Sequence, residues 1–113
     1  MTKVLAIETS CDETAASIVT NKGGIYKINS NIVASQIKDH SKWGGVVPEL
    51  AARKHLELIH FVISKAIEEA DVNYQEIDVI ASTVAPGLVG SLRIGSVAAR
   101  TLCAFYSKPF LGI

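Results

Sequence analysis

Carboxylates and hydroxyls are concentrated in one short segment near the N-terminus. The apolar run Val4–Ile7 ends abruptly in a polar loop that holds Glu8, Asp12 and Glu13. Backbone N–H groups and hydroxyls, including that of Thr14, can donate hydrogen bonds to phosphate oxygens, whereas the carboxylates repel a phosphate. A divalent cation removes this conflict, because hard cations take oxygen ligands and bridge carboxylates to phosphates. The segment therefore predicts a nucleotide or phosphate loop whose candidate residues are Glu8, Thr9, Ser10, Asp12 and Glu13.

A simpler interpretation of this acidic loop (residues 8–13) stays open. Asp12 and Glu13 can be solvated turn residues, and the Thr9 and Ser10 hydroxyls can satisfy neighbouring backbone groups. Cys11 is expected to pack against its neighbours, although its place in the loop would also suit a reactive thiol. The loop residues alone do not separate a binding loop from a solvated turn.

The acidic loop is expected to join two strands of a sheet. Val4–Ile7 is too short for a helix and is bounded by polar residues, which is typical of a buried central strand. The turn signal Asn21–Gly24 separates the second expected strand from the third. The expected strands are Val4–Ile7, Ala15–Thr20, Ile25–Ser35, Ile77–Val84 and Phe110–Ile113.

Two long helices are expected, at Pro48–Ala70 and Leu88–Ser107. The first has an apolar stripe made of Ala52, Leu56, Ile59, Ile63, Ala66 and Ala70. The second has a face of small residues, where a neighbouring backbone can approach closely, made of Ser91, Gly95 and Ala98. Both apolar arcs are wider than one stripe, so we expect these helices to contact more than the sheet.

The order of three strands, helix, strand, helix, strand predicts an α/β fold with a mixed five-stranded sheet. This order is typical of an actin-like, ribonuclease-H-like half-domain (the ASKHA fold), in which the first hairpin holds phosphate and metal. The segment Gln36–Val47 is expected to be a polar loop that Trp43 anchors on the core, and Asp71–Glu76 is expected to be a turn.

Composition limits the possible functions. Lys plus Arg and Asp plus Glu number 11 each, so the formal net charge is zero. A protein that binds nucleic acid by itself usually carries a basic excess, so a nucleic-acid substrate would need basic surface from elsewhere. The two cysteines form no disulfide framework, and Cys103 is expected to be a small buried hydrophobe. With no membrane span or signal segment in the sequence, we expect a cytoplasmic protein.

Two further groups of residues are of types that can bind an anion or a metal ion. Gly87 and Gly90 lie at a strand-to-helix junction, which suits anion binding but equally suits a tight turn and close helix packing. His55 and His60 are five residues apart on a helix, so they cannot share one metal ion. A two-metal nuclease would need more acids on later strands, where Asp78 is the one candidate.

Three segments occur in an order that is known from one protein family. They are Ala6–Ala15, Gly44–Arg53 followed by His55, and Ala85–Leu92 followed by Gly95 and Arg100. In these segments the chain resembles the TsaD/Kae/Gcp family of tRNA N6-adenosine threonylcarbamoyltransferases, long mislabelled as O-sialoglycoprotein endopeptidases. No residue of the chain supports a peptidase.

The resemblance implies transfer of a threonylcarbamoyl group from its adenylate to N6 of adenosine 37 in tRNA. It implies that the acidic loop faces the phosphate of the adenylate or of ATP. It adds Glu49, Arg53 and His55 as signature-loop candidates. It also implies that the two long helices form the docking surface for a TsaB-like or Pcc-like partner subunit, and that tRNA is bound by the full complex.

Family members are much longer than 113 residues, and their metal site and second lobe follow the fifth strand. The resemblance therefore implies that residues 1–113 are the N-terminal lobe, that no metal ligand lies within them, and that the lobe alone is inactive. A divalent metal, iron or zinc or Mg²⁺ with a nucleotide, is expected only for the full-length protein. A TsaB-like non-catalytic partner of the same fold is the alternative, which the acidic loop and Glu49 disfavour.

Overall fold

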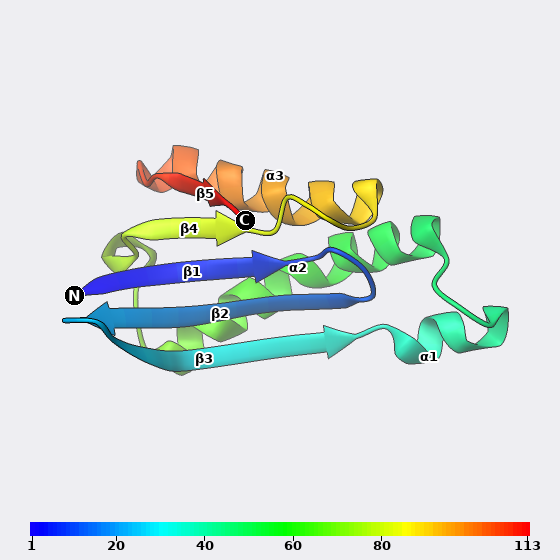
Figure 1. Cartoon of the computed structure of the whole chain (residues 1–113), viewed down its shortest axis with the longest axis horizontal. Coiled ribbons are helices and arrows are strands. Elements are labelled where there is room, and N and C mark those ends of the chain that lie inside the picture. The colour runs from blue at the N-terminus through cyan, green and yellow to red at the C-terminus, as the bar shows by residue number, and fades with distance from the viewer.

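The computed structural model describes all 113 residues and contains one five-stranded mixed sheet. Its strands are β1 (Thr2–Glu8), β2 (Glu13–Lys22), β3 (Ile25–Ser35), β4 (Val79–Ser82) and β5 (Phe110–Gly112). The first three form an antiparallel meander, and β4 and β5 add in parallel beside β1, which gives the order β3-β2-β1-β4-β5 (Figure 1). The predicted fold class and element order are confirmed, with strand ends that match or differ by at most two residues.

The two long helices cover one face of this sheet (Figure 1). They are α2 (Pro48–Ala70), as predicted, and α3 (Val89–Tyr106), one residue shorter at each end than predicted. Pro48 occupies the first turn of α2, where its missing N–H costs nothing, and Glu49 lies at the positive end of the helix. The chain leaves α2 at Asp71, which has the left-handed φ of 52°.

The core lies between the sheet and the helices. Residues alternate along β1, so that Leu5 and Ile7 point to the helices while Val4 and Ala6 point to the other face. Each fully buried Leu or Ile contributes about 1.5–3 kcal/mol. The core cluster consists of Leu5, Ile7, Ala16, Ile18, Ile59, Val62, Ile63, Ala66, Ile77, Ile80, Ala99 and Cys103, which confirms Cys103 as a buried hydrophobe.

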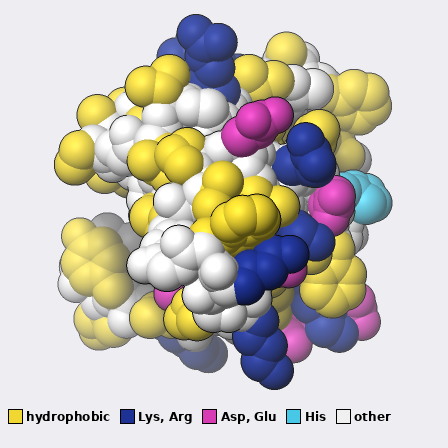
Figure 2. Space-filling view, turned by 90° about the vertical axis from the view of Figure 1, so that its right-hand side faces the viewer, with side chains coloured by type: hydrophobic (Ala, Val, Ile, Leu, Met, Phe, Trp, Pro, Cys, Tyr) yellow, Lys and Arg dark blue, Asp and Glu magenta, His cyan; other side chains and the backbone are white.

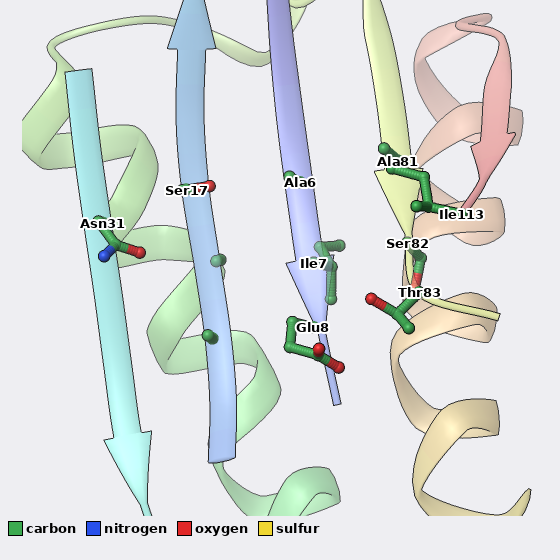
Figure 3. Close-up of a pocket in the computed structure, with 11 residues that line it drawn as sticks. Ala6, Ile7, Glu8, Ser17, Asn31, Ala81, Ser82, Thr83 and Ile113 are labelled. Carbon is green, nitrogen blue, oxygen red and sulfur yellow. The ribbon is translucent and has the colours of Figure 1, made fainter. Parts of the chain in front are cut away.

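The second face of the sheet has no helix over it. Figure 3 shows this face with the helices behind the strands, and a hollow of about 270 Å³ lies over small side chains such as Ala6 and Ser17. Large apolar residues of the same strands, such as Val33 and Leu111, are exposed. β1 is the central strand of the sheet, as predicted, but within this chain only its alternate residues are buried.

Two smaller expectations are wrong, those for the Gln36–Val47 segment and for Trp43. The predicted loop Gln36–Val47 contains the short helix α1 (Ile37–His40) and the 3₁₀ turn η1 (Ser41–Trp43), and the turn after α2 contains η2 (Tyr74–Glu76). Trp43 is 63% exposed, so it does not anchor on the core. Gln36 and His40 are the buried residues of that segment, and the His40 ring has hydrogen-bond partners on both sides.

The inward faces of the two helices are rotated from the predicted stripes. In α2, Leu56 is 64% exposed and His55 is fully buried. Hydrophobicity alone places the leucine inside, but the histidine is accommodated because both of its ring nitrogens are hydrogen-bonded. In α3, Ala99 is fully buried instead of Ala98. Neither α2 nor α3 combines the length and apolar character that a membrane crossing requires.

Candidate functional site

The acidic loop lies at the end of the sheet where β1 stops and where α2 and α3 both begin (Figure 1). Its residues line a shallow hollow of about 130 Å³, namely Glu8, Ser10, Cys11, Asp12 and Glu13. A helix N-terminus carries a partial positive charge, so two of them at this end favour anionic groups. The structure therefore brings the five predicted loop residues together, four of them around the hollow and Thr9 beneath it.

The loop is folded back on itself. The backbone N–H of Ser10 donates to Oε1 of Glu8 at 2.5 Å. The carbonyl of Asp12 accepts a hydrogen bond from the backbone N–H of Gln36 at 2.9 Å. The Ser10 N–H is thus already bonded to a carboxylate, whereas the Asp12 and Glu13 carboxylates keep access to the hollow.

Two hydroxyls that were expected to donate to a phosphate are directed into the protein instead. Thr9 is fully buried, and its hydroxyl donates to the carbonyl of Ser91 at 2.7 Å and accepts from the N–H of Gly95 at 3.0 Å. Thr14 is also fully buried and lies 2.7 Å from Nδ1 of His55. The expectation is corrected for both threonines, since a hydroxyl without solvent access that already has partners cannot reach a ligand.

The start of α3 packs closely against the acidic loop. The N–H of Leu88 donates to the carbonyl of Ser10 at 2.8 Å. A Cβ on Gly87 would lie 2.6 Å from that same carbonyl oxygen, so no larger residue fits without movement of the backbone. Gly90 faces Ala52 with room for a Cβ at 3.5 Å. Gly87 therefore serves the close approach of two loops, which was the second interpretation of the glycine-rich junction.

The start of α2 reaches the loop from the other side through His55. Its Nε2 lies 2.8 Å from the carbonyl oxygen of Cys11. Because a carbonyl only accepts, Nε2 carries the proton and Nδ1 accepts from the Thr14 hydroxyl. Burial lowers the pKa of His55, although the hydrogen bond to Cys11 and the charges of Glu8 and Asp12 act in the opposite direction. A neutral His55 ring therefore fixes the backbone of the acidic loop.

The other two signature-loop candidates do not contact the acidic loop. Glu49 and Arg53 are exposed on the first turns of α2 and form an ion pair with each other at 3.7 Å. Cys11 is exposed, so the expectation that it packs is wrong. Sequence analysis missed Gln36 and His40, which are buried beside His55. Polar residues in a short segment between a strand and a helix gave no periodic signal that could have placed them.

A metal site made by this chain does not fit its residues. No group of three or more His, Cys, Asp and Glu side chains converges as an ion would require. The imidazole rings of His40 and His55 are already hydrogen-bonded within the protein. The two-metal nuclease is not supported either, because Asp78 bonds to the backbone of Lys3 at the far end of β1, about 16 Å from Glu8 at 3.3 Å per strand residue.

Charge at this end of the molecule is mixed. Figure 2 looks onto it and shows Lys and Arg, Asp and Glu, and hydrophobic side chains intermingled. With a net charge of zero, the chain offers no large basic surface on this face that would hold nucleic acid by itself.

The chain is similar over its whole length to known proteins. It is 74% identical over 113 residues to a tRNA N6-adenosine threonylcarbamoyltransferase of Prochlorococcus marinus subsp. pastoris, and 50% identical to one of a Synechococcus species. These alignments include every residue of this chain but only 32% of each relative. The chain therefore spans about a third of the length of these relatives. The N-terminal segment Ala6–Ala15 lies within both alignments.

The fold is similar to that of a solved structure, YeaZ from Pseudomonas aeruginosa. The TM-score is 0.71 at 20% identity, with all of this chain and 44% of that chain covered. A likeness at this identity shows the ASKHA-type α/β fold alone.

A family model adds a direct assignment. The model described as "TsaD: tRNA N6-adenosine threonylcarbamoyltransferase" matches residues 27–113, which include the signature loop, α2, α3 and the glycine-rich junction. The chain belongs to the TsaD family of tRNA N6-adenosine threonylcarbamoyltransferases.

Proposed function

We propose that this chain is the N-terminal lobe, residues 1–113, of an enzyme that transfers a threonylcarbamoyl group from its adenylate to N6 of adenosine 37 in tRNA. The observation that carries the proposal is the 74% identity over the whole chain to a transferase of that name. A tRNA substrate would place the protein in the cytoplasm, and cell fractionation followed by immunoblotting tests that location.

The acidic loop is proposed to face the phosphate of the adenylate or of ATP. The N-terminal end of α3 packs on this loop, where the Leu88 N–H donates to the Ser10 carbonyl, and the partial positive charge of that end offsets part of the repulsion between a phosphate and the Asp12 and Glu13 carboxylates. The residues of this chain supply only part of a cation's shell, so Mg²⁺ would come with the nucleotide and the iron or zinc ligands would come from the rest of the protein. This lobe therefore positions the nucleotide end of the substrate and does not complete the reaction alone.

The experiment uses a full-length chimera, made of this chain followed by the remaining two-thirds of the Prochlorococcus relative. The chimera and the 113-residue chain are each incubated with threonylcarbamoyl-adenylate and unmodified tRNA, and the modified nucleoside is measured by mass spectrometry. We expect product from the chimera alone. Product from the 113-residue chain, or none from a folded chimera, would contradict the proposal.

A matched pair of variants tests the acidic loop in the same chimera. Asp12→Ala combined with Glu13→Ala should weaken ATP or adenylate binding by at least about tenfold, the effect of losing about 1.4 kcal/mol. Glu57→Ala combined with Glu68→Ala removes two carboxylates from exposed positions of α2 and should leave binding unchanged. Equal affinity of the two double variants would argue against a nucleotide role for the loop.

A partner subunit, TsaB-like or Pcc-like, is proposed to dock on α2 and α3. The support is a hollow of about 300 Å³ between these helices, beside exposed Leu56 and Val97. In the chimera, Val97→Glu should weaken binding of a TsaB-like protein in calorimetry. Tyr26→Glu, which replaces an exposed apolar residue on β3, is the control. Equal binding by both variants would remove the helices as the interface.

A TsaB-like non-catalytic role is the second candidate, because the fold is shared with YeaZ. That likeness is at 20% identity, against 74% for the transferase relative. An inactive but folded chimera that still binds a full-length transferase would favour this second role.

A further inference from the structure

Three buried side chains form a series of hydrogen bonds between two loops of the proposed site. Gln36 and His55 are fully buried and His40 is 3% exposed. They connect the backbone of Val47, which ends the Gly44–Val47 loop, to the backbone of the acidic loop. None of the roles derived so far requires a continuous connection between these two loops.

The donor-to-acceptor direction of these hydrogen bonds is fixed at the Val47 end. The backbone N–H of Val47 donates to Nδ1 of His40 at 3.0 Å, so that nitrogen has no proton. The proton of the neutral ring is then on Nε2, which donates to Oε1 of Gln36 at 2.9 Å. The amide of Gln36 is oriented as a result, with its NH₂ group directed away from His40.

The second half continues in the same direction. The NH₂ group of Gln36 lies 3.3 Å from the carbonyl of Ala51 and 3.4 Å from Nδ1 of His55. Nε2 of His55 then donates to the carbonyl of Cys11 at 2.8 Å. Both ends are backbone groups with a fixed role, one N–H and one C=O, so only one arrangement of protons satisfies every member.

We propose that Gln36, His40 and His55 are positioning residues that couple the Gly44–Val47 loop to the acidic loop through one directed hydrogen-bond relay. The relay holds the Cys11 carbonyl in place, and the backbone bond from Gln36 N–H to the Asp12 carbonyl ties a member of the relay to the next residue. A displacement of Val47 leaves Nδ1 of His40 without its donor, and a turn of that ring takes the Nε2 donor away from Oε1 of Gln36, so that the Gln36 amide is no longer held in its orientation toward Ala51 and His55. Contact of a substrate or of another part of the protein with the Gly44–Val47 loop therefore changes the position of the acidic loop.

The sequence of the loops suits this role. Gly44 has a φ of 74°, and no heavy atom lies within 4 Å of a Cβ placed on Gly44 or on Gly45. The two glycines thus have open space beside them, and the loop is bonded to a buried side chain through the Val47 N–H and His40. A shallow hollow connects the two loops on the surface, lined by Asp12, Ile37, His40, Ser41, Gly45 and Val46.

The first test reads the protons directly and needs no variant. Ring-nitrogen NMR spectra of the full-length chimera, with labelled histidine, should show His40 and His55 as neutral rings with the proton on Nε2. A proton on Nδ1 of either ring at neutral pH would overturn the relay. The readout is independent of substrate, so it does not depend on the proposed function.

The second test changes the relay far from the acidic loop. His40→Asn keeps an acceptor for Val47 but removes the donor to Gln36, and it should move the amide signals of Cys11, Asp12 and Glu13 in the ligand-free chimera. His60→Asn, at an exposed position of α2, is the control and should leave them in place. A folded His40→Asn variant with unmoved loop signals would overturn the coupling.

The third test separates the relay from the proposed function on which its substrate role rests. His40→Asn should weaken ATP binding about tenfold, within the range of ordinary coupling between sites. At the other end, His55→Gln places an NH₂ group near the Nε2 position and should restore most of the affinity that His55→Leu loses. Moved loop signals with unchanged affinity would support the relay and count against the nucleotide role of the acidic loop.

Discussion

The acidic loop is held from two sides that use different chemistry. On the α3 side, the contacts are a threonine hydroxyl bridged to Ser91 and Gly95, a backbone bond to Ser10, and two glycines that permit close approach. On the α2 side, the contacts run through the rings of His55 and His40 and the amide between them. No group on the α3 side titrates near neutral pH, whereas the α2 side contains two imidazoles.

The two sides therefore differ in how they respond to pH. Close packing without titratable groups gives the loop a position that is independent of pH, because van der Waals contact and hydroxyl bonds do not change with proton concentration. The histidine side can respond to its surroundings, because its hydrogen bonds depend on which ring nitrogen carries the proton. We infer that the α3 side fixes the loop and the α2 side adjusts it.

The largest expected effect is on the α3 side. A Cβ on Gly95 would lie 2.6 Å from Oγ1 of Thr9 and 3.3 Å from Cγ2 of Ile7. Gly95→Ala should therefore destabilise the chain by about 1–3 kcal/mol, the usual cost of overpacking. This is opposite to the gain of up to about 1 kcal/mol that alanine gives in an unobstructed helix. Urea unfolding followed by circular dichroism measures the change.

Gly90→Ala is the matched control in the same helix. Its Cβ would meet Ala52 at an ordinary 3.5 Å, so the variant should be neutral or slightly stabilised. If both variants were stabilised equally, the close approach between α3 and Thr9 would not constrain the loop. The α3 side would then not be the side that fixes the position of the acidic loop.

The same comparison explains which parts the sequence could predict. The positions of the strands and of both long helices along the chain follow from apolar periodicity, because burial of alternating or helical faces is a local property of the sequence. The acidic loop was also predictable, since three carboxylates and several hydroxyls follow directly after an apolar strand. The direction of Thr9 into α3 was not, because it depends on an 82-residue separation to Ser91.

The contacts of the histidines on the α2 side could not be predicted from the sequence for a related reason. A hydropathy stripe places Leu56 inside and treats His55 as polar, whereas the folded protein buries the histidine with two partners and exposes the leucine. A buried polar residue is stable only when its hydrogen bonds are satisfied, and the partners Thr14 and Cys11 are more than 40 residues away. Periodicity carries no information about such partners.

An intermediate effect is expected from pH on the α2 side. Burial lowers the pKa of His55 in the folded chain, so the unfolded chain takes up this proton at a higher pH than the folded chain. Stability is therefore complete above the ordinary histidine pKa of about 6.5 and falls as the pH drops from there toward the lowered folded value. Urea midpoints measured from about pH 8 to about pH 5 should show this decrease.

Two variants assign the pH effect to its residue. His55→Gln cannot titrate and should flatten the decrease, although its stability at neutral pH is lower. His60→Gln removes an exposed histidine from the same helix and should keep it. A decrease that survives in His55→Gln would mean that other groups cause it, and the α2 side would be no more sensitive to pH than the α3 side.

The smallest effect is expected for charges that lie on α2 but outside its buried contacts. Glu49 and Arg53 are 3.7 Å apart and largely exposed, and an exposed pair at i and i+4 contributes about 0.3–0.5 kcal/mol. Glu49→Gln should change the urea midpoint by no more than this pair supplies, and it should leave the amide signals of Asp12 and Glu13 unmoved. Because Glu49 is at the start of the same helix as His55, this variant separates surface charge from the buried relay. Movement of the loop signals in Glu49→Gln would mean that α2 acts on the loop through its charged N-terminus rather than through the ring of His55.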